Sequence, residues 1–119
     1  MGNATLDART LVEGLVKDLA SPTLVAYATC SSVASDDARP LAEQWMSGEA
    51  APLNDELERL TFLRESFDRI NEEEGADMAR ALILGSLEDD TWVPQAIRHG
   101  RLKEVKAHFT RYLTDSSGY

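Results

Sequence analysis

The feature that most constrains the fold is the spacing of apolar residues between Pro52 and Ile70. Steps of three and four residues place these side chains along one face of an α-helix, and charged residues cover most of the other faces. About five turns of unbroken spacing predict a long helix at the centre of the fold. Asn54 is expected as its N-cap, or Pro52 at or just before its first turn. The apolar stripe consists of Leu53, Leu57, Leu60, Leu63, Phe67 and Ile70.

Shorter helices are predicted on both sides of this helix, because apolar residues recur at helical spacing between turn-type residues. Ser21 and Pro22 suit the N-cap and first position of one helix, and Pro40 is expected in the first turn of another. Gly75 and Gly100 are expected to end helices. No alternating strand pattern competes, so the sequence predicts an all-α fold of about seven helices. The short segments are 5–20, 22–30, 38–46, 76–87, 94–100 and 101–113.

The order of these segments divides the chain into three regions. Residues 1–52 are expected to form a helix-turn-helix-like bundle, and residues 53–74 the long central helix. Residues 75–119 are expected to form a small helical region that binds a partner. Within it, the helix after Gly75 is expected to bury Met78, Ala81 and Leu82, together with Leu84 or Leu87.

Three short helices with a tight turn before the third are typical of a helix-turn-helix, whose third helix reads base edges in DNA. Here Arg39 and Gln44 are the side chains suited to that contact. Three carboxylates in the same segment repel phosphates, so we expect any DNA binding to be weak. A helix-turn-helix retained as a protein-interaction scaffold fits the segment equally well. The three carboxylates belong to Asp36, Asp37 and Glu43.

Composition narrows the function classes. A chain of 119 residues is long enough for one domain with its own core. The formal charge of −9 argues against a general nucleic-acid binder. No apolar run is long enough to span a membrane, and the first eleven residues lack a signal-peptide pattern. A single Cys30 excludes an intrachain disulfide, so we expect a cytoplasmic protein without a membrane partner.

Signals of catalysis are absent from the sequence. It contains no glycine-rich phosphate loop, no cysteine pair for zinc and no nucleophile elbow. His99 and His108 are nine residues apart, which does not place them on one helical face as a metal pair. We therefore expect neither an enzyme nor a bound cofactor or metal ion.

The last part of the chain is locally basic, although the whole chain is acidic. Five cations oppose a single Glu104 between residues 98 and 111. They can complement a helix C-terminus and pair with the acidic central helix, or they can meet an acidic partner or a phosphate-bearing ligand. The five are Arg98, Arg101, Lys103, Lys106 and Arg111.

The order of these features resembles the Xre/MbcA/ParS-type antitoxin family over residues 10–113. In the N-terminal half the similar stretches are LASPTLVAYATCSSV, then Gln44-Trp45, then residues 48–52 before the long helix. In the C-terminal half, residues 81–113 are similar to the family's toxin-binding domain. That domain has a proline-initiated turn that continues with an apolar residue, an arginine and a glycine. Pro94, Ala96, Ile97 and Gly100 occupy the places of this turn, and Val105 fits the apolar spacing of its closing helix.

The resemblance implies an antitoxin-like protein that binds and sterically blocks a RES-type, NAD-degrading toxin and that can also repress its own operon. It further implies a homodimer. The residues expected to contact the partner are Trp92, Arg98, Arg101, His108, Arg111 and Tyr119. A core role for Trp92 is an open alternative. Two other functions stay open: a helix-turn-helix transcriptional regulator, and an adaptor, for instance from a phage, that binds a host protein.

Overall fold

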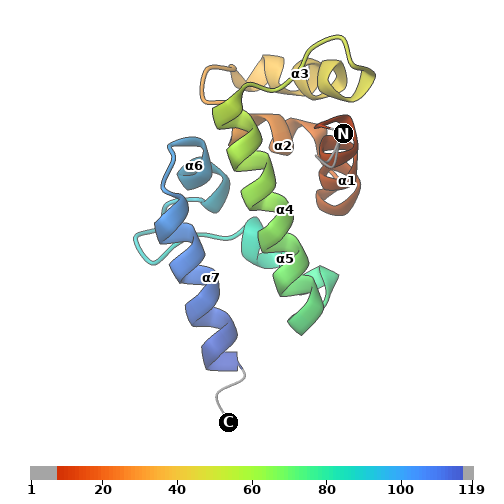
Figure 1. The fold of residues 1–119 in the computed structure, drawn as a ribbon. Coiled ribbons are helices and arrows are strands. Elements are labelled where there is room, and N and C mark those ends of the chain that lie inside the picture. Colours follow the sequence, from red (N-terminus) through yellow and green to blue (C-terminus); the bar gives the residue numbers. More distant parts are fainter. Residues whose placement is uncertain (1–7, 117–119) are drawn as a thin grey trace.

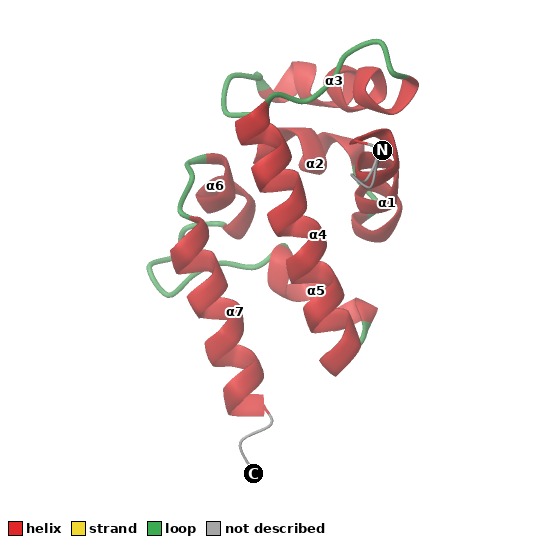
Figure 2. Ribbon diagram, in the orientation of Figure 1, coloured by secondary structure: helices red, strands yellow, loops and turns green. Residues whose placement is uncertain are grey.

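A computed structural model describes residues 8–116 of the chain. These residues form seven α-helices and no β-strand, as predicted (Figures 1 and 2). Within the described part, extended pairing is limited to an isolated antiparallel bridge between Ser86 and Trp92. The helices are α1 (Ala8–Leu19), α2 (Pro22–Thr29), α3 (Ser35–Ser47), α4 (Asn54–Glu74), α5 (Ala76–Ile83), α6 (Val93–Arg98) and α7 (Leu102–Ser116). None of these helices is long and apolar enough to cross a membrane.

The predicted long helix is α4, and the other helices surround it (Figure 1). Its stripe is buried from Leu60 to Ile70, but Leu57 is only half-buried and Leu53 is 65% exposed. Asn54 is the first helical residue and not the N-cap, so the first of the two predicted starts is wrong, and the second, with Pro52 just before the first turn, is confirmed. The N-cap position belongs to Leu53, whose backbone N–H donates to the carboxylate of Glu56 at 2.8 Å. The Glu56 carboxylate thus satisfies the N–H of the N-cap residue, whereas the leucine side chain offers no acceptor to the amides of the first turn.

One predicted helix start and one predicted helix end are confirmed. Ser21 caps α2, since its side-chain oxygen accepts from the backbone N–H of Leu24 at 3.0 Å, and Pro22 is the first helical residue. Gly75 forms the junction between α4 and α5 with a φ of 95°, a backbone conformation that favours glycine.

The helix α3 starts earlier than its proline suggests. It begins at Ser35, so Pro40 lies inside the helix and not in its first turn. Asp36 and Asp37 occupy the first turn, where their charges suit the positive end of the helix dipole. Ala38, Ala42 and Trp45 are buried, so tertiary packing supports the helix on both sides of the proline.

The buried face of α5 also differs from the prediction. Apolar residues occupy more than one face of this eight-residue helix, so spacing alone does not select its buried side. Tertiary contact selects it: Arg80 donates to the backbone carbonyl of Asp18 at 2.9 Å and holds α5 against the end of α1. The buried residues are Ala79, Ile83 and, beyond the helix end, Leu87, whereas Met78 and Leu82 are only partly buried and Ala81 is exposed.

The C-terminal helices pack on two different partners. Figure 1 shows α7 running beside α4, with Val105, Phe109 and Leu113 buried in their contact. The short α6 packs instead against α2 in the N-terminal part of the chain. The loop of residues 84–92, which joins α5 to α6, therefore lies where N-terminal and C-terminal segments meet. We call it the α5–α6 loop.

Candidate partner-binding surface

The α5–α6 loop is held in shape by its own backbone. Leu87 N–H donates to the carbonyl of Thr91 at 2.8 Å, and Asp90 N–H donates to the carbonyl of Leu87 at 3.0 Å. Asp90 has a φ of 69°, a conformation that aspartate tolerates better than most residues. The Asp89 side chain accepts from the backbone N–H of Thr91 at 3.0 Å, which is a common turn-forming bond of aspartate. Hydrogen bonds among the loop's own residues thus fix its shape.

Two large apolar side chains stand exposed on this loop. Trp92 is 39% exposed and Leu84 is 41% exposed. They are neighbours in space, because the indole N–H of Trp92 donates to the Leu84 carbonyl at 2.8 Å. Leu53 is the third exposed large apolar residue among those the structure describes, and it lies at the start of α4. Trp92 is therefore at the surface rather than a core anchor. Of the two leucines that spacing offered for the buried face, Leu84 lies at the surface and Leu87 is buried.

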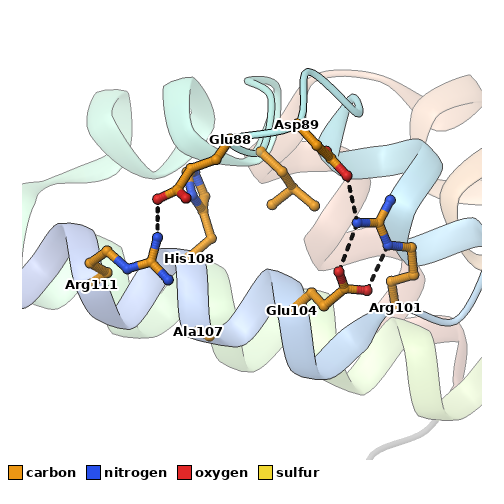
Figure 3. A pocket seen from close by; sticks show the side chains of 8 residues that line it. Glu88, Asp89, Arg101, Glu104, Ala107, His108 and Arg111 are labelled. Carbon is orange, nitrogen blue, oxygen red and sulfur yellow. Dashed lines mark hydrogen bonds and ion pairs between the residues drawn. The ribbon is translucent and has the colours of Figure 1, made fainter.

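A first hollow of about 300 Å³ lies between the loop and α7 (Figure 3). It brings together three of the predicted partner-binding residues, Arg101, His108 and Arg111. Carboxylates from the loop face them across the opening, and Arg111 donates to Glu88. Leu87, Glu88, Asp89, Arg101, Glu104, Ala107, His108 and Arg111 line this hollow.

Arg101 is fully engaged at one end of this hollow. Its guanidinium donates to Glu104 at 2.7 and 2.8 Å and to Asp89 at 2.9 Å, and it reaches the Thr91 hydroxyl at 3.1 Å (Figure 3). Hydrogen bonds from the Thr91 side chain and backbone, together with Arg101, lower the pKa of Asp89 to about 2. The Arg101 hydrogen bond lowers the pKa of Glu104, and the Glu104 and Asp89 bonds raise the pKa of Arg101. Arg101 orders the loop as well as facing solvent.

A second hollow of about 390 Å³ lies on the side of the loop that faces α2. Trp92 forms one wall, and its ring centre is 6.2 Å from that of Tyr27 on α2. Ser35, the first residue of α3, lines the same hollow. The remaining lining residues are Ser21, Thr23 and Leu24. Trp92 thus lines the second hollow and not the first.

Arg98 lines neither hollow, although the sequence groups it with the partner-binding cations. Its guanidinium donates to four backbone carbonyls at the end of α2 and in the turn that follows, at distances from 2.6 to 3.1 Å. It also lies 4.4 Å from the centre of the Tyr27 ring. The acceptors are Tyr27, Cys30, Ser31 and Val33. No sequence motif indicates this contact, because carbonyl acceptors are present in every residue.

The other predicted residues lie elsewhere. Arg39 and Gln44 are exposed on α3, as DNA contact requires, but Arg39 is paired with Glu43 at 3.3 Å. Tyr119 lies outside the described residues. DNA contact by α3 and partner contact by Tyr119 both stay predictions. In the part of the chain that the structure covers, no cluster of three or more histidine, cysteine or acidic residues is arranged to hold a metal ion.

Comparison of the chain with family models, with curated proteins and with solved structures finds no match. The surface around the α5–α6 loop is therefore the main structural guide to function.

Proposed function

We propose that this chain is an antitoxin-like protein that binds a partner protein through the α5–α6 loop and inhibits it sterically. The observation that supports this proposal most directly is the exposed pair Leu84 and Trp92 on a loop already ordered by hydrogen bonds. Adjacent exposed apolar side chains cost free energy in water, and a preordered surface loses little entropy when it binds. Tryptophan is also among the residues that most often dominate binding energy in protein interfaces.

The surroundings of this pair favour a partner with a basic contact face. The first hollow carries Glu88, Asp89 and Glu104 against Arg101 and Arg111, an excess of one negative charge. The whole chain has a formal charge of −9, which speeds the approach of a positively charged partner. By the family resemblance, the proposed partner is a RES-type, NAD-degrading toxin whose active-site cleft the loop and α7 cover.

The exposed surface of α3 supports protein binding over DNA binding as the primary function. Arg39 would have to leave Glu43 to reach a base or phosphate. Asp36 and Asp37 would then stand near the DNA backbone, where their charges oppose binding. We therefore do not propose an operator-binding regulator as the main function.

The proposal is tested by expressing a RES-type toxin from the same genome with and without this chain and measuring cellular NAD. We expect the wild-type chain to preserve NAD and to co-purify with the toxin. Replacing Trp92 and Leu84 together by alanine should weaken the complex at least tenfold, because one interface anchor contributes about 2 kcal/mol or more.

The matched control is Leu53→Ala, which removes an even more exposed apolar side chain from a different part of the surface. It should leave binding and NAD protection unchanged. A wild-type chain that neither binds nor protects would refute the antitoxin function. Full NAD protection by the Trp92 and Leu84 double variant would show that the partner binds elsewhere than at these two side chains of the loop.

A further inference from the structure

The turn between α2 and α3, residues 30–34, depends on a side chain from the other half of the chain. A helix end leaves backbone carbonyls without partners, and they must find other donors. Arg98 provides donors for carbonyls at this helix end and in the turn. One terminal nitrogen of its guanidinium donates to the carbonyls of Tyr27 and Cys30 at 2.9 and 3.0 Å. The other donates to the carbonyls of Ser31 and Val33 at 3.1 and 2.6 Å.

The same arginine is linked to the exposed surface through Tyr27. Its guanidinium carbon lies 4.4 Å from the centre of the Tyr27 ring, a cation–π distance. That ring is 6.2 Å from the ring of Trp92. Trp92 and Arg98 also stand at opposite ends of α6, which is short and whose Val93 and Ile97 are fully buried. A displacement of Trp92 therefore acts on Arg98 both through Tyr27 and through α6.

From this geometry we propose that Arg98 is a positioning residue that couples the Trp92 surface to the start of α3. A partner that contacts Trp92 changes how firmly Arg98 holds the α2–α3 turn, and so changes the stability of the first turn of α3. Coupling of this kind is reciprocal, so whatever fixes α3 also changes affinity at Trp92. The coupling itself follows from these contacts alone, and its use in regulation rests on the proposed function.

The second hollow adds a direct route. Trp92 and Ser35 line it from opposite segments, one at the end of the α5–α6 loop and one at the start of α3. A side chain inserted there touches both segments at once. The routes through Tyr27 and α6 end at the five-residue turn, and the direct route ends at Ser35 next to it. Backbone amides in and beside the turn are therefore the place to measure the effect.

Hydrogen exchange of the amides of Cys30, Val33 and Asp37 tests the coupling without any partner. Each of these amides donates a backbone hydrogen bond in or beside the turn. In otherwise wild-type protein, Trp92→Ala should speed their exchange about tenfold, the scale of ordinary coupling between sites. In an Arg98→Gln background the same substitution should speed it less than about threefold, because the link is already cut.

Leu84→Ala is the matched control, since Leu84 lies on the same loop but has no described contact with Tyr27 or Arg98. It should leave the three amides unchanged. If Arg98→Gln does not fold, Arg98→Lys replaces it: lysine keeps the charge near Tyr27, but its compact ammonium has only three donors for four carbonyls. A Trp92→Ala effect that is absent, or equal in both backgrounds, overturns the coupling.

A second measurement separates this proposal from the proposed function. With the toxin bound, exchange of the same amides should slow in wild-type protein and should slow less in the Arg98 variant. A toxin that binds at Trp92 without altering these amides would overturn the coupling and leave the antitoxin function standing. If no toxin binds, the effect of Trp92→Ala on amide exchange in the wild-type and Arg98→Gln backgrounds still decides whether the coupling exists.

Discussion

Arg98 and Arg101 carry the same charge three residues apart, yet they serve different parts of the molecule. Arg98 donates to backbone carbonyls of the α2–α3 turn and lies against the ring of Tyr27. Arg101 donates to the carboxylates of Asp89 and Glu104 and to one hydroxyl. Carbonyls cannot move away into water without breaking the turn, whereas carboxylate side chains can. The first arginine therefore supports the fold, and the second shapes a surface.

The backbone between the two arginines explains why they diverge. Gly100 has a φ of 80°, so the chain turns sharply after α6 and α7 leaves in a new direction. Arg59 of α4 stabilises this turn, because its Nε donates to the carbonyl of Ile97 at 3.1 Å. Arg98 is thereby directed toward α2, and Arg101 toward the α5–α6 loop.

The largest effect is expected from Arg98→Ala. This substitution removes four hydrogen bonds to backbone carbonyls and the cation–π contact, and the Cys30 carbonyl alone among the four has a described backbone donor, the N–H of Val33 at 3.3 Å. The loss should lower the free energy of unfolding by about 3 kcal/mol. Denaturant unfolding followed by circular dichroism measures the loss. Arg101→Ala serves as the control, and its unfolding midpoint should stay close to that of wild type, since exposed ion pairs contribute little. Equal losses for the two variants would show that the contrast between them is wrong.

A smaller effect is expected from Gly100→Ala, which alters the turn between the two arginines and neither arginine itself. The positive φ disfavours any side chain, and the new Cβ would lie 3.4 Å from Nη2 of Arg59. We expect a loss of about 1 kcal/mol in the free energy of unfolding. Gly100→Asn is the matched comparison, because asparagine tolerates the left-handed conformation and should lose less. If Gly100→Ala leaves the free energy of unfolding unchanged, the turn between α6 and α7 does not depend on glycine.

The contrast between the two arginines also marks the limit of sequence reasoning. Helix number, the all-α class and the turns at Ser21, Gly75 and Gly100 follow from local rules on capping, proline and apolar spacing. The central stripe from Leu60 to Ile70 is predictable because a 3.6-residue period sustained over several turns is specific to an amphipathic helix. Local rules fail at Pro40, which lies inside α3 and not in its first turn.

Roles that depend on contacts distant in sequence are beyond those rules. Spacing groups Arg98 with Arg101 as surface cations, and only the fold places Arg98 beside carbonyls that are 65 to 71 residues away. Spacing also leaves open whether Leu84 or Leu87 is buried, and only the packing of α5 exposes the first and buries the second. The cluster of Arg101, His108 and Arg111 can be anticipated, since one helix and the residue before it supply all three.

The smallest effect concerns the pH dependence of the Arg101 cluster. Asp89 has a pKa of about 2 in the folded protein, below the ordinary value of 3.8. Because the folded value is lowered, the ionised carboxylate contributes stability that is fully present above pH 3.8. That contribution is lost as the pH falls through about 2. The difference in unfolding midpoint between wild type and Asp89→Asn should therefore be constant above about pH 4 and shrink toward about pH 2.

The separate causes of this low pKa can be resolved by following the Asp89 carboxyl carbon by NMR. The largest cause is the hydrogen bond from the Thr91 side chain, followed by the Thr91 backbone and then Arg101. Thr91→Val should thus raise the pKa of Asp89 more than Arg101→Ala does, and Arg98→Gln should leave it unchanged. A shift in the Arg98 variant would mean that the two arginines act on one another through Gly100. An unchanged pKa of Asp89 in the Arg98→Gln variant would confirm that the cluster around Arg101 is electrostatically independent of the α2–α3 turn.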